Sequence, residues 1–381
     1  MQDIQQFANE IGLDLDLLAC IQCGKCSGGC PVSITTALNI RFLVYESLLD
    51  ALPELVHMEE LWDCTCCFTC VERCPKDVRP AELIITLRNQ LVESGKIPGT
   101  IGEALMGIFR QGNPLGLARE DRALWAEGLD VKPAREGCDT LLFTCCYSAY
   151  DVQSQPATKA LVRILHAAGV DLGYLGTEET CCGNEVKRVG EKAMFDEMLV
   201  EEGKALLESV GARCIVTTSP HCYNTFKNEY GLEGIEVLHY TQVLARLLEE
   251  GQLKLSVPVE KTVTYHDPCF LGKQNKVFDE PRAVLRAIPG LNFVEMDRIR
   301  ERSLCCEGGG GRMWFEGTNT EDRLAFQRVQ EAVDTGAEVL AVACPFCLAM
   351  LADAAKVKGL EEQLKVMDIS ELVVQALGDG G

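Results

Sequence analysis

Two groups of cysteines near the start of the chain have the types and spacing of metal ligands. Each group follows the pattern C-x2-C-x2-C-x3-C-P, and 33 residues separate the first group from the second. Thiolates are soft ligands, and three of them on one tight turn reach three corners of a cubane whose fourth corner points away from that turn. The duplicated pattern therefore favours two iron–sulfur clusters over a pair of zinc knuckles. The first group is Cys20, Cys23, Cys26 and Cys30, and the second is Cys64, Cys67, Cys70 and Cys74.

These two groups predict a crossed set of ligands. In bacterial two-cluster ferredoxins, which the pattern resembles, the fourth cysteine of each group binds the cluster of the other group. Between the groups, apolar residues recur at helical spacing from Thr35 to Leu61, so we expect residues 1–93 to form an α-helical ferredoxin domain. We assign Cys20, Cys23, Cys26 and Cys74 to one cubane 4Fe–4S cluster, and Cys64, Cys67, Cys70 and Cys30 to the other.

The composition fits a globular protein with reduced thiols. The chain has 381 residues, of which 47% are hydrophobic, and an odd number of cysteines, 21. This length, and a start without the basic and apolar segments of a signal peptide, argue against a disulfide framework and predict a cytoplasmic protein. The net charge of −21 argues against nucleic acid binding. No apolar run reaches about 18 residues, so we expect no direct membrane insertion.

The rest of the chain is an internal repeat with a nearly constant offset. Four cysteine positions recur after 124 or 125 residues. In each copy an apolar run ends in a cysteine-bearing turn and a helical pattern follows, for example at 348–356 after Pro345. Such units predict parallel sheets with the cysteines beyond the C-terminal ends of the strands. The recurring pairs are Cys145 and Cys269, Cys181 and Cys305, Cys182 and Cys306, and Cys222 and Cys347, and the expected strands are 140–144, 214–218, 262–265 and 339–343.

The second copy carries five cysteines, which is more than one cubane takes. The adjacent pair Cys305-Cys306 suits a cluster that is larger or more open than a cubane. Glycines 308–311 leave the backbone free to approach the cluster and to donate N–H groups to its sulfurs. They do not form a phosphate loop, because no Lys-Ser or Lys-Thr follows them.

With these motifs the chain resembles the iron–sulfur subunit family of heterodisulfide reductase, in which a ferredoxin-like portion is fused to two cysteine-rich "CCG" domains. Related modules occur in iron–sulfur subunits of glycolate and lactate dehydrogenases and in accessory subunits of benzoyl-CoA reductase. The resemblance implies an α+β or α/β fold, with an α-helical two-cluster ferredoxin domain followed by two duplicated, Rossmann-like α/β CCG units. We place a connecting segment at 94–136, which we expect to be irregular because it is rich in Gly and Pro, the first CCG domain at 137–256 and the second at 257–381.

The resemblance also implies a non-cubane 4Fe–4S cluster on the five cysteines of the second CCG domain. The first domain departs from the pattern, because Ser219 stands at the position that matches Cys344. We therefore expect a further 4Fe–4S cluster there as a four-cysteine cubane, or no cluster; Cys146 and His221 remain alternative ligands, although a hydrogen-bonded histidine is the favoured interpretation of His221. Glu307 stands where the motif has glycine, and Cys138 and Cys214 are interpreted as ordinary buried thiols. The assigned ligands are Cys145, Cys181, Cys182 and Cys222 in the first domain, and Cys269, Cys305, Cys306, Cys344 and Cys347 in the second.

The function that the resemblance implies is that of an oxidoreductase subunit. It would pass electrons from the ferredoxin clusters to a CCG-bound cluster, where a disulfide or thiol substrate is reduced. His266, Lys273 and Arg312 are the candidate catalytic residues, because they lie near the second site in sequence and supply a proton donor and two cations for an anionic thiol.

The alternative is a pure electron relay that links a flavoprotein to another catalytic or quinone-reducing subunit, as in complexes of the benzoyl-CoA reductase or glycolate/lactate dehydrogenase type. The chain has no flavin or nicotinamide fingerprint, so under either hypothesis its electrons come from partners. The expected partners are other subunits of a redox complex, namely a flavoprotein or a ferredoxin-type protein, with a membrane cytochrome as a further candidate.

Overall fold

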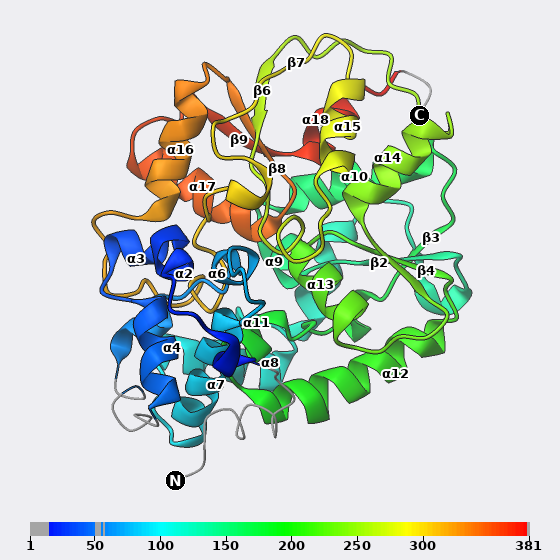
Figure 1. Cartoon of the computed structure of the whole chain (residues 1–381). Helices are drawn as coiled ribbons and strands as arrows, with labels where there is room; N and C mark the ends of the chain where they lie inside the picture. Colours follow the sequence, from blue (N-terminus) through cyan, green and yellow to red (C-terminus); the bar gives the residue numbers. More distant parts are fainter. Residues whose placement is uncertain (1–14, 50–54, 56–57, 379–381) are drawn as a thin grey trace.

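The N-terminal part of the chain is helical and forms the lower left of the molecule in Figure 1. The structure is a computed structural model that describes residues 15–49, 55 and 58–378; residues 50–54, 56 and 57 of the predicted helical stretch lie outside it. The helical ferredoxin domain that the sequence predicts is confirmed within the described residues. Its elements are η1 (Leu17–Ala19), α2 (Lys25–Gly29), α3 (Val32–Thr35), α4 (Ile40–Leu48), η2 (Glu59–Asp63), α6 (Thr69–Glu72) and α7 (Pro80–Glu93).

Two longer helices frame the cysteine groups of this domain. Helix α4 begins where Asn39 Oδ1 accepts the N–H of Phe42 at 3.1 Å, which satisfies a donor that the first turn leaves free. Helix α7 begins at Pro80, whose missing N–H is not needed in a first turn. Most of α7 is buried because the helix lies against later parts of the chain; Asn89 Nδ2 donates to Gly190 O at 2.7 Å.

Residues 94–136 are not the irregular connection that their glycines and prolines suggested. They contain α8 (Gly99–Gln111), η3 (Arg119–Ala126), β1 (Lys132–Pro133) and η4 (Ala134–Glu136). Pro98 precedes the first turn of α8, and Gly112 ends the helix with φ 72°. Gly107 lies inside α8 because a Cβ there would come within 2.9 Å of Asn113 O. Gly112 therefore ends the helix, and Gly107 lets the following chain pack against it. Composition alone does not distinguish these roles from breaking the helix.

The first repeated unit is a five-stranded parallel sheet with the order β1-β3-β2-β4-β5. Because the strands are parallel, the C-terminal ends of β2 and β4 lie at the same edge, where Cys145 follows β2 and Cys222 follows β4. The elements after β1 and η4 are β2 (Thr140–Phe143), α9 (Cys146–Tyr150), α10 (Gln155–Ala167), β3 (Leu172–Tyr174), η5 (Gly176–Glu178), α11 (Asn184–Arg188), the π-helix η6 (Met194–Val200), α12 (Glu201–Val210), β4 (Cys214–Thr217), α13 (Pro220–Asn228), β5 (Glu236–His239) and α14 (Tyr240–Glu249).

The second unit repeats four of these strands in the corresponding order, β7-β6-β8-β9, and all pairs are again parallel. The four predicted strands end within one residue of β2, β4, β6 and β8, and Pro345 lies in the first turn of a helix as predicted. The elements are β6 (Thr262–Tyr265), α15 (Asp279–Ala287), β7 (Asn292–Phe293), η7 (Arg300–Arg302), α16 (Leu324–Asp334), β8 (Val339–Val342), α17 (Pro345–Val357), β9 (Lys365–Asp368) and α18 (Ile369–Gln375).

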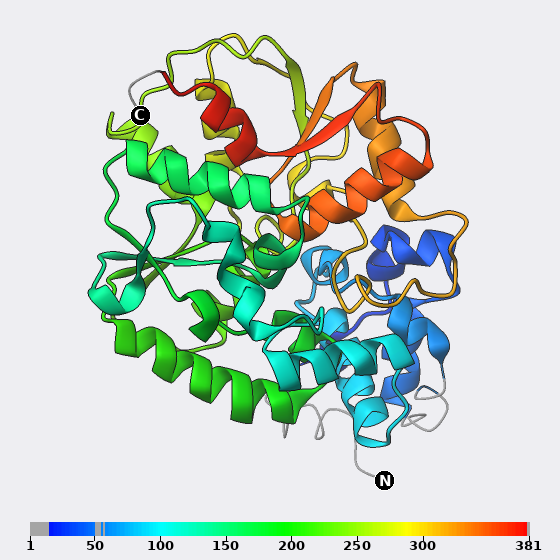
Figure 2. The ribbon, with the colours of Figure 1, turned by 180° about the vertical axis from the view of Figure 1, so that it is seen from behind.

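The two units share one hydrophobic core. Leu142 and Val216 of the first sheet belong to the same buried cluster as Val263 and Val339 of the second. Helix α10 packs beside α18, which is clear from behind in Figure 2. The duplicated α/β architecture that the sequence predicts is thus confirmed.

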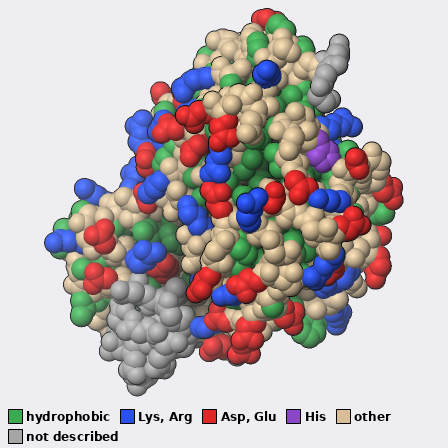
Figure 3. Space-filling view, turned by 90° about the vertical axis from the view of Figure 1, so that its right-hand side faces the viewer, with side chains coloured by type: hydrophobic (Ala, Val, Ile, Leu, Met, Phe, Trp, Pro, Cys, Tyr) green, Lys and Arg blue, Asp and Glu red, His purple; other side chains and the backbone are tan. Residues whose placement is uncertain are grey.

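The surface carries charges of both signs. On the face in Figure 3, basic and acidic side chains are interspersed, and acidic ones gather toward the lower edge. This distribution differs from the clustered basic surface that nucleic acids bind. None of the helices in the described ranges combines the length and apolarity needed to cross a membrane.

Candidate iron–sulfur sites

Three cysteines of the first group share a pocket with the last cysteine of the second group. The pocket is lined by Cys20, Cys23, Cys26 and Cys74, and by cationic side chains that include Lys25. Cys23 is exposed and the other three thiols are half-buried. The pocket brings together the four thiols that the crossed assignment gives to one cluster; the ligand assignment itself stays a prediction.

The four cysteines assigned to the other ferredoxin cluster are all buried. Burial raises the pKa of the Cys30 thiol, and the nearby charge of Cys67 raises this pKa further. The pKa of Cys70 is raised by burial and then by the charges of Cys30 and Cys67. Cys30 therefore lies among the thiols of the second group, which is the arrangement that the crossed assignment requires.

One backbone feature recurs at all four cysteine groups. The residue two positions after a cysteine has a left-handed backbone and donates its N–H to the sulfur of that cysteine. Hydrogen bonds of this kind favour the thiolate that a metal needs. The donor–sulfur pairs are Gln22 N to Cys20 and Cys66 N to Cys64, both at 3.4 Å, Gly183 N to Cys181 at 3.4 Å, and Glu307 N to Cys305 at 3.3 Å.

Glu307 shows how a residue with a side chain occupies the position of the expected glycine. Its φ is 69°, a left-handed value that is uncommon outside glycine. Its carboxylate lies 3.5 Å from Arg312 and 3.6 Å from Arg323, and accepts the N–H of Ala325 at 3.3 Å. These contacts hold the carboxylate in place, and the backbone N–H of Glu307 faces Cys305.

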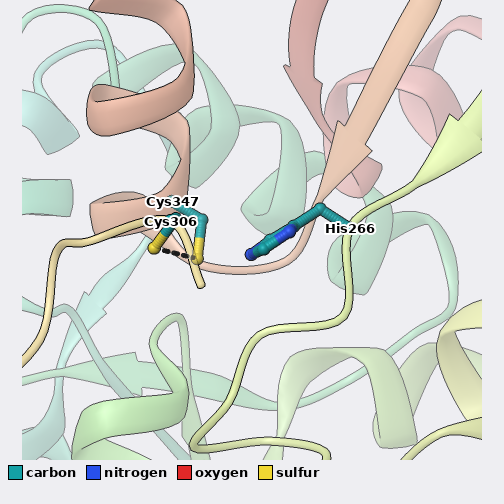
Figure 4. Close-up of side chains that lie close together, drawn as sticks. All are labelled: His266, Cys306 and Cys347. Atoms are coloured by element: carbon teal, nitrogen blue, oxygen red, sulfur yellow. Dashed lines mark hydrogen bonds between the residues drawn. The ribbon is translucent and has the colours of Figure 1, made fainter. Parts of the chain in front are cut away.

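The five cysteines of the second CCG copy converge beyond the C-terminal ends of β6 and β8. Cys306 Sγ and Cys347 Sγ lie 3.2 Å apart (Figure 4). The thiol of Cys269 lies within hydrogen-bonding reach of Cys305, and that of Cys344 within reach of Cys347. The contacts therefore form one row, in the order Cys269, Cys305, Cys306, Cys347 and Cys344.

His266 points toward two of these cysteines in Figure 4, and its nearest ring nitrogen lies within 4.8 Å of the sulfurs of Cys306 and Cys347. The other side of the ring is occupied, because Arg328 Nε donates to His266 Nδ1 at 3.1 Å. Burial, and then the charge of Arg328, lower the pKa of His266 well below its usual value. A neutral imidazole that accepts at Nδ1 carries its proton on Nε2. This environment favours a hydrogen-bond donor to sulfur over a proton source for a substrate.

The other two candidate catalytic residues lie between the ferredoxin domain and the second CCG copy. Lys273 Nζ donates to Thr69 Oγ1 and to Ser303 O, both at 2.8 Å. Arg312 lies 3.5 Å from Asp63. Lys273 also lines an open, charged cleft of about 300 Å³, whereas Arg312 is buried among acidic partners. Their contacts join two parts of the chain, and a catalytic role for either stays a prediction.

The cysteines of the first CCG copy also converge. Cys222, in the first turn of α13, lies within hydrogen-bonding reach of Cys145 and Cys182, and Cys182 lies within reach of Cys181. Ser219 does not aim a free oxygen at them: its Oγ accepts the N–H of His221 at 3.2 Å and caps α13.

His221 lies against the second site rather than the first. Its ring packs between Phe270 and Phe346, at 4.3 and 4.5 Å between ring centres, and its Nδ1 lies 2.9 Å from Glu185 Oε1. Burial lowers the pKa of His221, but hydrogen bonds to Cys344 and Glu185 outweigh burial and raise the pKa to about 10. The hydrogen-bonded histidine that the sequence favoured is what the structure shows, although it sits in a helix and faces the other copy.

The second CCG copy touches the second ferredoxin cysteine group directly. Cys305 Sγ donates to Thr65 Oγ1 at 3.4 Å, and the thiol of Cys67 lies within hydrogen-bonding reach of Cys305. A Cβ on Gly309 would lie 2.7 Å from Thr65 O. The glycine run therefore permits close approach, but the backbone that it approaches belongs to the ferredoxin domain.

Arg88 holds this junction together, and sequence reasoning missed it. Its guanidinium donates to Cys64 O at 2.7 Å and to the carbonyl oxygens of Arg188 and Gly310, both at 3.0 Å. It is fully buried, so its hydrogen bonds to these carbonyl groups are shielded from water. The only signal in the sequence was a single arginine inside the apolar pattern of α7.

Comparison with protein families gives two matches. The model described as "Cysteine-rich domain" (CCG) matches residues 140–227 and 263–352, and that described as "4Fe-4S dicluster domain" matches residues 16–78. These ranges contain all of the cysteines assigned above as ligands.

Curated relatives cover nearly the whole chain. A "Probable iron-sulfur-binding oxidoreductase FadF" of Bacillus subtilis is 34% identical over 95% of this chain, and an "EtfAB:quinone oxidoreductase" of Syntrophomonas wolfei is 34% identical over 99%. The chain spans only 60% of the length of each of these two relatives. A subunit of the dihydromethanophenazine:CoB–CoM heterodisulfide reductase of Methanosarcina barkeri is 33% identical, with 96% of this chain and 95% of the relative aligned.

The alignment with this last relative includes both the ferredoxin-type and the CCG regions of the chain, and the two proteins have nearly the same length. A ferredoxin-type part followed by two parallel-sheet CCG units, with cysteines at four convergent sites, is the organisation that the structure shows. The chain therefore belongs to the family of CCG-domain iron–sulfur proteins that includes this heterodisulfide reductase subunit.

Proposed function

We propose that this chain relays single electrons from a redox partner at its ferredoxin domain to its CCG units. One observation carries the proposal: Cys305 Sγ lies 3.4 Å from Thr65 Oγ1, and the thiol of Cys67 is within hydrogen-bonding reach of Cys305. Cys67 and Cys305 are assigned to different clusters, yet their side chains meet. Electrons can pass between such sites without a mobile carrier or a moving domain.

The donor sets fit iron–sulfur clusters. All 21 cysteines of the sequence lie in the described ranges, and none forms a disulfide. Within these ranges, only His266, Cys306 and Cys347 bring three candidate ligand atoms within 4.8 Å of one another, so the other groups have a wider spacing than a single tetrahedral ion prefers. When bound, the clusters supply one-electron redox centres. In the proposal the two ferredoxin groups hold cubane 4Fe–4S clusters on the crossed ligand sets, and the five cysteines of the second CCG domain hold a non-cubane one.

The chain places the sites in a row. The Cys20 group lies at the surface, and the Cys30 and Cys67 group lies buried behind it. The Cys305 group follows, and beyond it His221 links Cys344 to the helix that carries Cys222. Apart from the half-buried Cys269, the assigned ligands of the other three groups are buried, so an electron donor can approach most closely at the Cys20 end.

The entry face has the features of a protein-docking surface. Leu18, Ile21, Phe42 and Tyr45 are exposed by 88%, 60%, 44% and 47%, although all four are large and apolar. Lys25, Arg41 and Lys76 line the pocket of the Cys20 group, on a protein whose net charge is −21. This combination suits an acidic flavoprotein or ferredoxin-type donor. The name of the Syntrophomonas relative joins EtfAB to quinone, which supports a relay; a membrane cytochrome is a further candidate on the acceptor side.

Reduction of a disulfide or thiol substrate at the second CCG site is the second candidate function. The five-thiol set beside His266 favours it. Against a substrate between the two CCG sites stand the packed rings of Tyr147, His221, Phe270 and Phe346, all of which are buried. The relay is therefore the preferred function.

The boundaries 1–93, 94–136, 137–256 and 257–381 and a cytoplasmic location belong to the same proposal. The two sheets begin and end inside the last two segments, apart from β1 and η4, which precede β2. Cluster binding requires reduced thiols, which a cytoplasm maintains.

Replacement of Cys67 by alanine tests the relay. It should remove the buried ferredoxin site and prevent rapid reduction of the second CCG site by a low-potential donor, while the Cys20 site is still reduced. Rapid-freeze electron paramagnetic resonance follows each site, and the iron content reports whether the second CCG site survives. Cys138→Ala, at a half-buried thiol outside all four groups, is the control. Reduction of an intact second CCG site at the wild-type rate in Cys67→Ala would show that electrons take another route.

A further inference from the structure

The sheet register gives a different correspondence between the first cysteines of the two CCG copies from the one that sequence spacing gave. Thr140 of β2 pairs with Cys214 of β4, and Val263 of β6 pairs with Val339 of β8. Strands β4 and β8 correspond at an offset of 125 residues, as Cys222 and Cys347 do. Thr140 therefore corresponds to Val263, an offset of 123, and this offset carries Cys146, not Cys145, onto Cys269.

The contacts between thiols agree with the register. In the second copy Cys269 begins the row that continues through Cys305, Cys306 and Cys347 to Cys344. The first copy has a row of the same length: the neighbour of Cys181 at one end is Cys146, and the neighbour of Cys222 at the other end is Cys145. Cys146 thus takes the place of Cys269, and Cys145 takes the place of Cys344.

This arrangement explains why a serine is tolerated at position 219. The thiol expected there is supplied from the end of β2, since Cys145 lies within reach of Cys222. Ser219 is fully buried and its oxygen is engaged in capping α13. The five thiols of this row in the first copy are all buried, with exposures between 2% and 9%.

A buried guanidinium supports Cys146 as a thiolate. Arg122 Nη1 donates to Cys146 Sγ at 3.4 Å, and its Nη2 donates to Thr144 O at 3.0 Å. Glu179 fixes the guanidinium through Nη2 at 2.5 Å and also accepts the N–H of Thr144 at 2.8 Å. A charge-assisted hydrogen bond of this kind stabilises the thiolate, the form of the sulfur that binds a metal, more than the neutral thiol.

We propose that Cys146 is the fifth ligand of the first CCG site, so that both copies present five thiolates to a cluster of the same open kind. This inference rests on the proposed binding of clusters by the chain. It replaces the expectation of a four-cysteine cubane or of no cluster at Cys145, Cys181, Cys182 and Cys222.

The test compares Cys146→Ser, Ser219→Cys and a control, Cys214→Ser, in the full chain. Wild-type protein should contain roughly 16 irons, four for each site. Cys146→Ser should lose roughly four irons, or lose the Mössbauer and paramagnetic signals of the first site, while the other three sites keep theirs. The three remaining signals serve as the measure of folding. Ser219→Cys should leave the iron content and the spectra unchanged, because the five-thiol set is already complete.

Either of two results would overturn the inference. Unchanged iron and spectra in Cys146→Ser would show that Cys146 is a bystander. A new signal or added iron in Ser219→Cys would show that the first site had lacked a sulfur. Roughly 12 irons in wild-type protein would show an empty first site and overturn this inference, yet would leave the relay through the other three sites intact. Failure of the relay would instead appear as slow transfer between fully loaded sites.

Discussion

Cys305 Sγ lies 3.4 Å from Thr65 Oγ1, although 240 residues separate the two in sequence. Thr65 stands between the ligand cysteines of the ferredoxin domain, and Cys305 is assigned as a ligand of the second CCG site. The hydroxyl is therefore one polar contact between the two loops that carry these cysteines. Both side chains are buried, so solvent does not compete for this hydrogen bond.

Thr65→Val tests this contact without removing a cysteine. The variant keeps the shape of the side chain but removes the hydrogen bond between Thr65 and the sulfur of Cys305, at a cost of about 1 kcal/mol to the native state. We expect slower transfer between the ferredoxin and second CCG sites and a shifted potential of the latter, both measured by redox titration and rapid-freeze spectroscopy. Thr86→Val is the matched control, because Thr86 is also fully buried but bonds only to Glu82 O within α7. Equal transfer rates and equal potentials in the two variants would show that Thr65 has no specific role in electron transfer.

The crossed ligand sets predict which signal each ferredoxin mutation removes. Cys30→Ala should abolish the cluster of Cys64, Cys67 and Cys70, because Cys30 lies with Cys67 and Cys70. Cys74→Ala should abolish the other cluster, because Cys74 shares the pocket of Cys20. Paramagnetic resonance of the reduced variants distinguishes the two. Loss of the Cys20 signal in Cys30→Ala would mean that each group binds its own cluster.

Charge reversal at the entry face should slow association with an acidic donor. Lys25→Glu combined with Arg41→Glu removes two cations from the pocket of the Cys20 group. Steering by opposite charges changes association rates by about tenfold or more at low salt, and the difference should shrink as salt is added. Stopped-flow reduction measures the rate constant. Arg135→Glu, at an exposed site in η4, is the control, and an equal effect there would assign the change to net charge alone.

Asp368 predicts a pH-dependent stability. Burial raises the pKa of this carboxyl group from 3.8 to about 7 in the folded chain, although hydrogen bonds from Ser370 and Tyr240 oppose the shift. The folded state therefore holds a proton that the unfolded state has lost. The bound proton stabilises the folded chain fully below pH about 4, and this stabilisation is lost as the pH rises through about 7. The total change in the free energy of unfolding is on the order of 4 kcal/mol.

Asp368→Asn should remove this dependence, because the amide stays neutral at every pH. Thermal unfolding measured from about pH 5 to about pH 8 should show that the stability of the wild-type protein falls relative to that of the variant. A constant difference between the two proteins across that range would mean that Asp368 does not titrate there.

Much of the fold could be predicted from local pattern. The apolar runs that became β2, β4, β6 and β8 are short, buried and followed by cysteines, and their ends were predicted within one residue. Helix α8 was missed because Pro98 and Gly112 were interpreted as signs of an irregular segment, whereas they begin and end the helix.

The site was harder to predict, because its decisive features depend on contacts between distant segments. Counting along the sequence paired Cys145 with Cys269, whereas the sheet register gives an offset of 123, on which the proposal for Cys146 rests. Lys273 was chosen because it lies near the second site in sequence, but its partner Thr69 belongs to the ferredoxin domain. Arg88 gave almost no signal, because its role depends on carbonyl groups from three separate segments.

The order in which the sites are reduced is the most direct test of the relay. Wild-type protein with all sites loaded is mixed with a low-potential donor and frozen at increasing times, and the paramagnetic signals of the sites are separated. We predict that the Cys20 site is reduced first, the buried ferredoxin site next and the second CCG site last, with the last rate independent of donor concentration once the first two sites are reduced. Reduction of the second CCG site before the ferredoxin sites, at a rate proportional to donor concentration, would contradict the account.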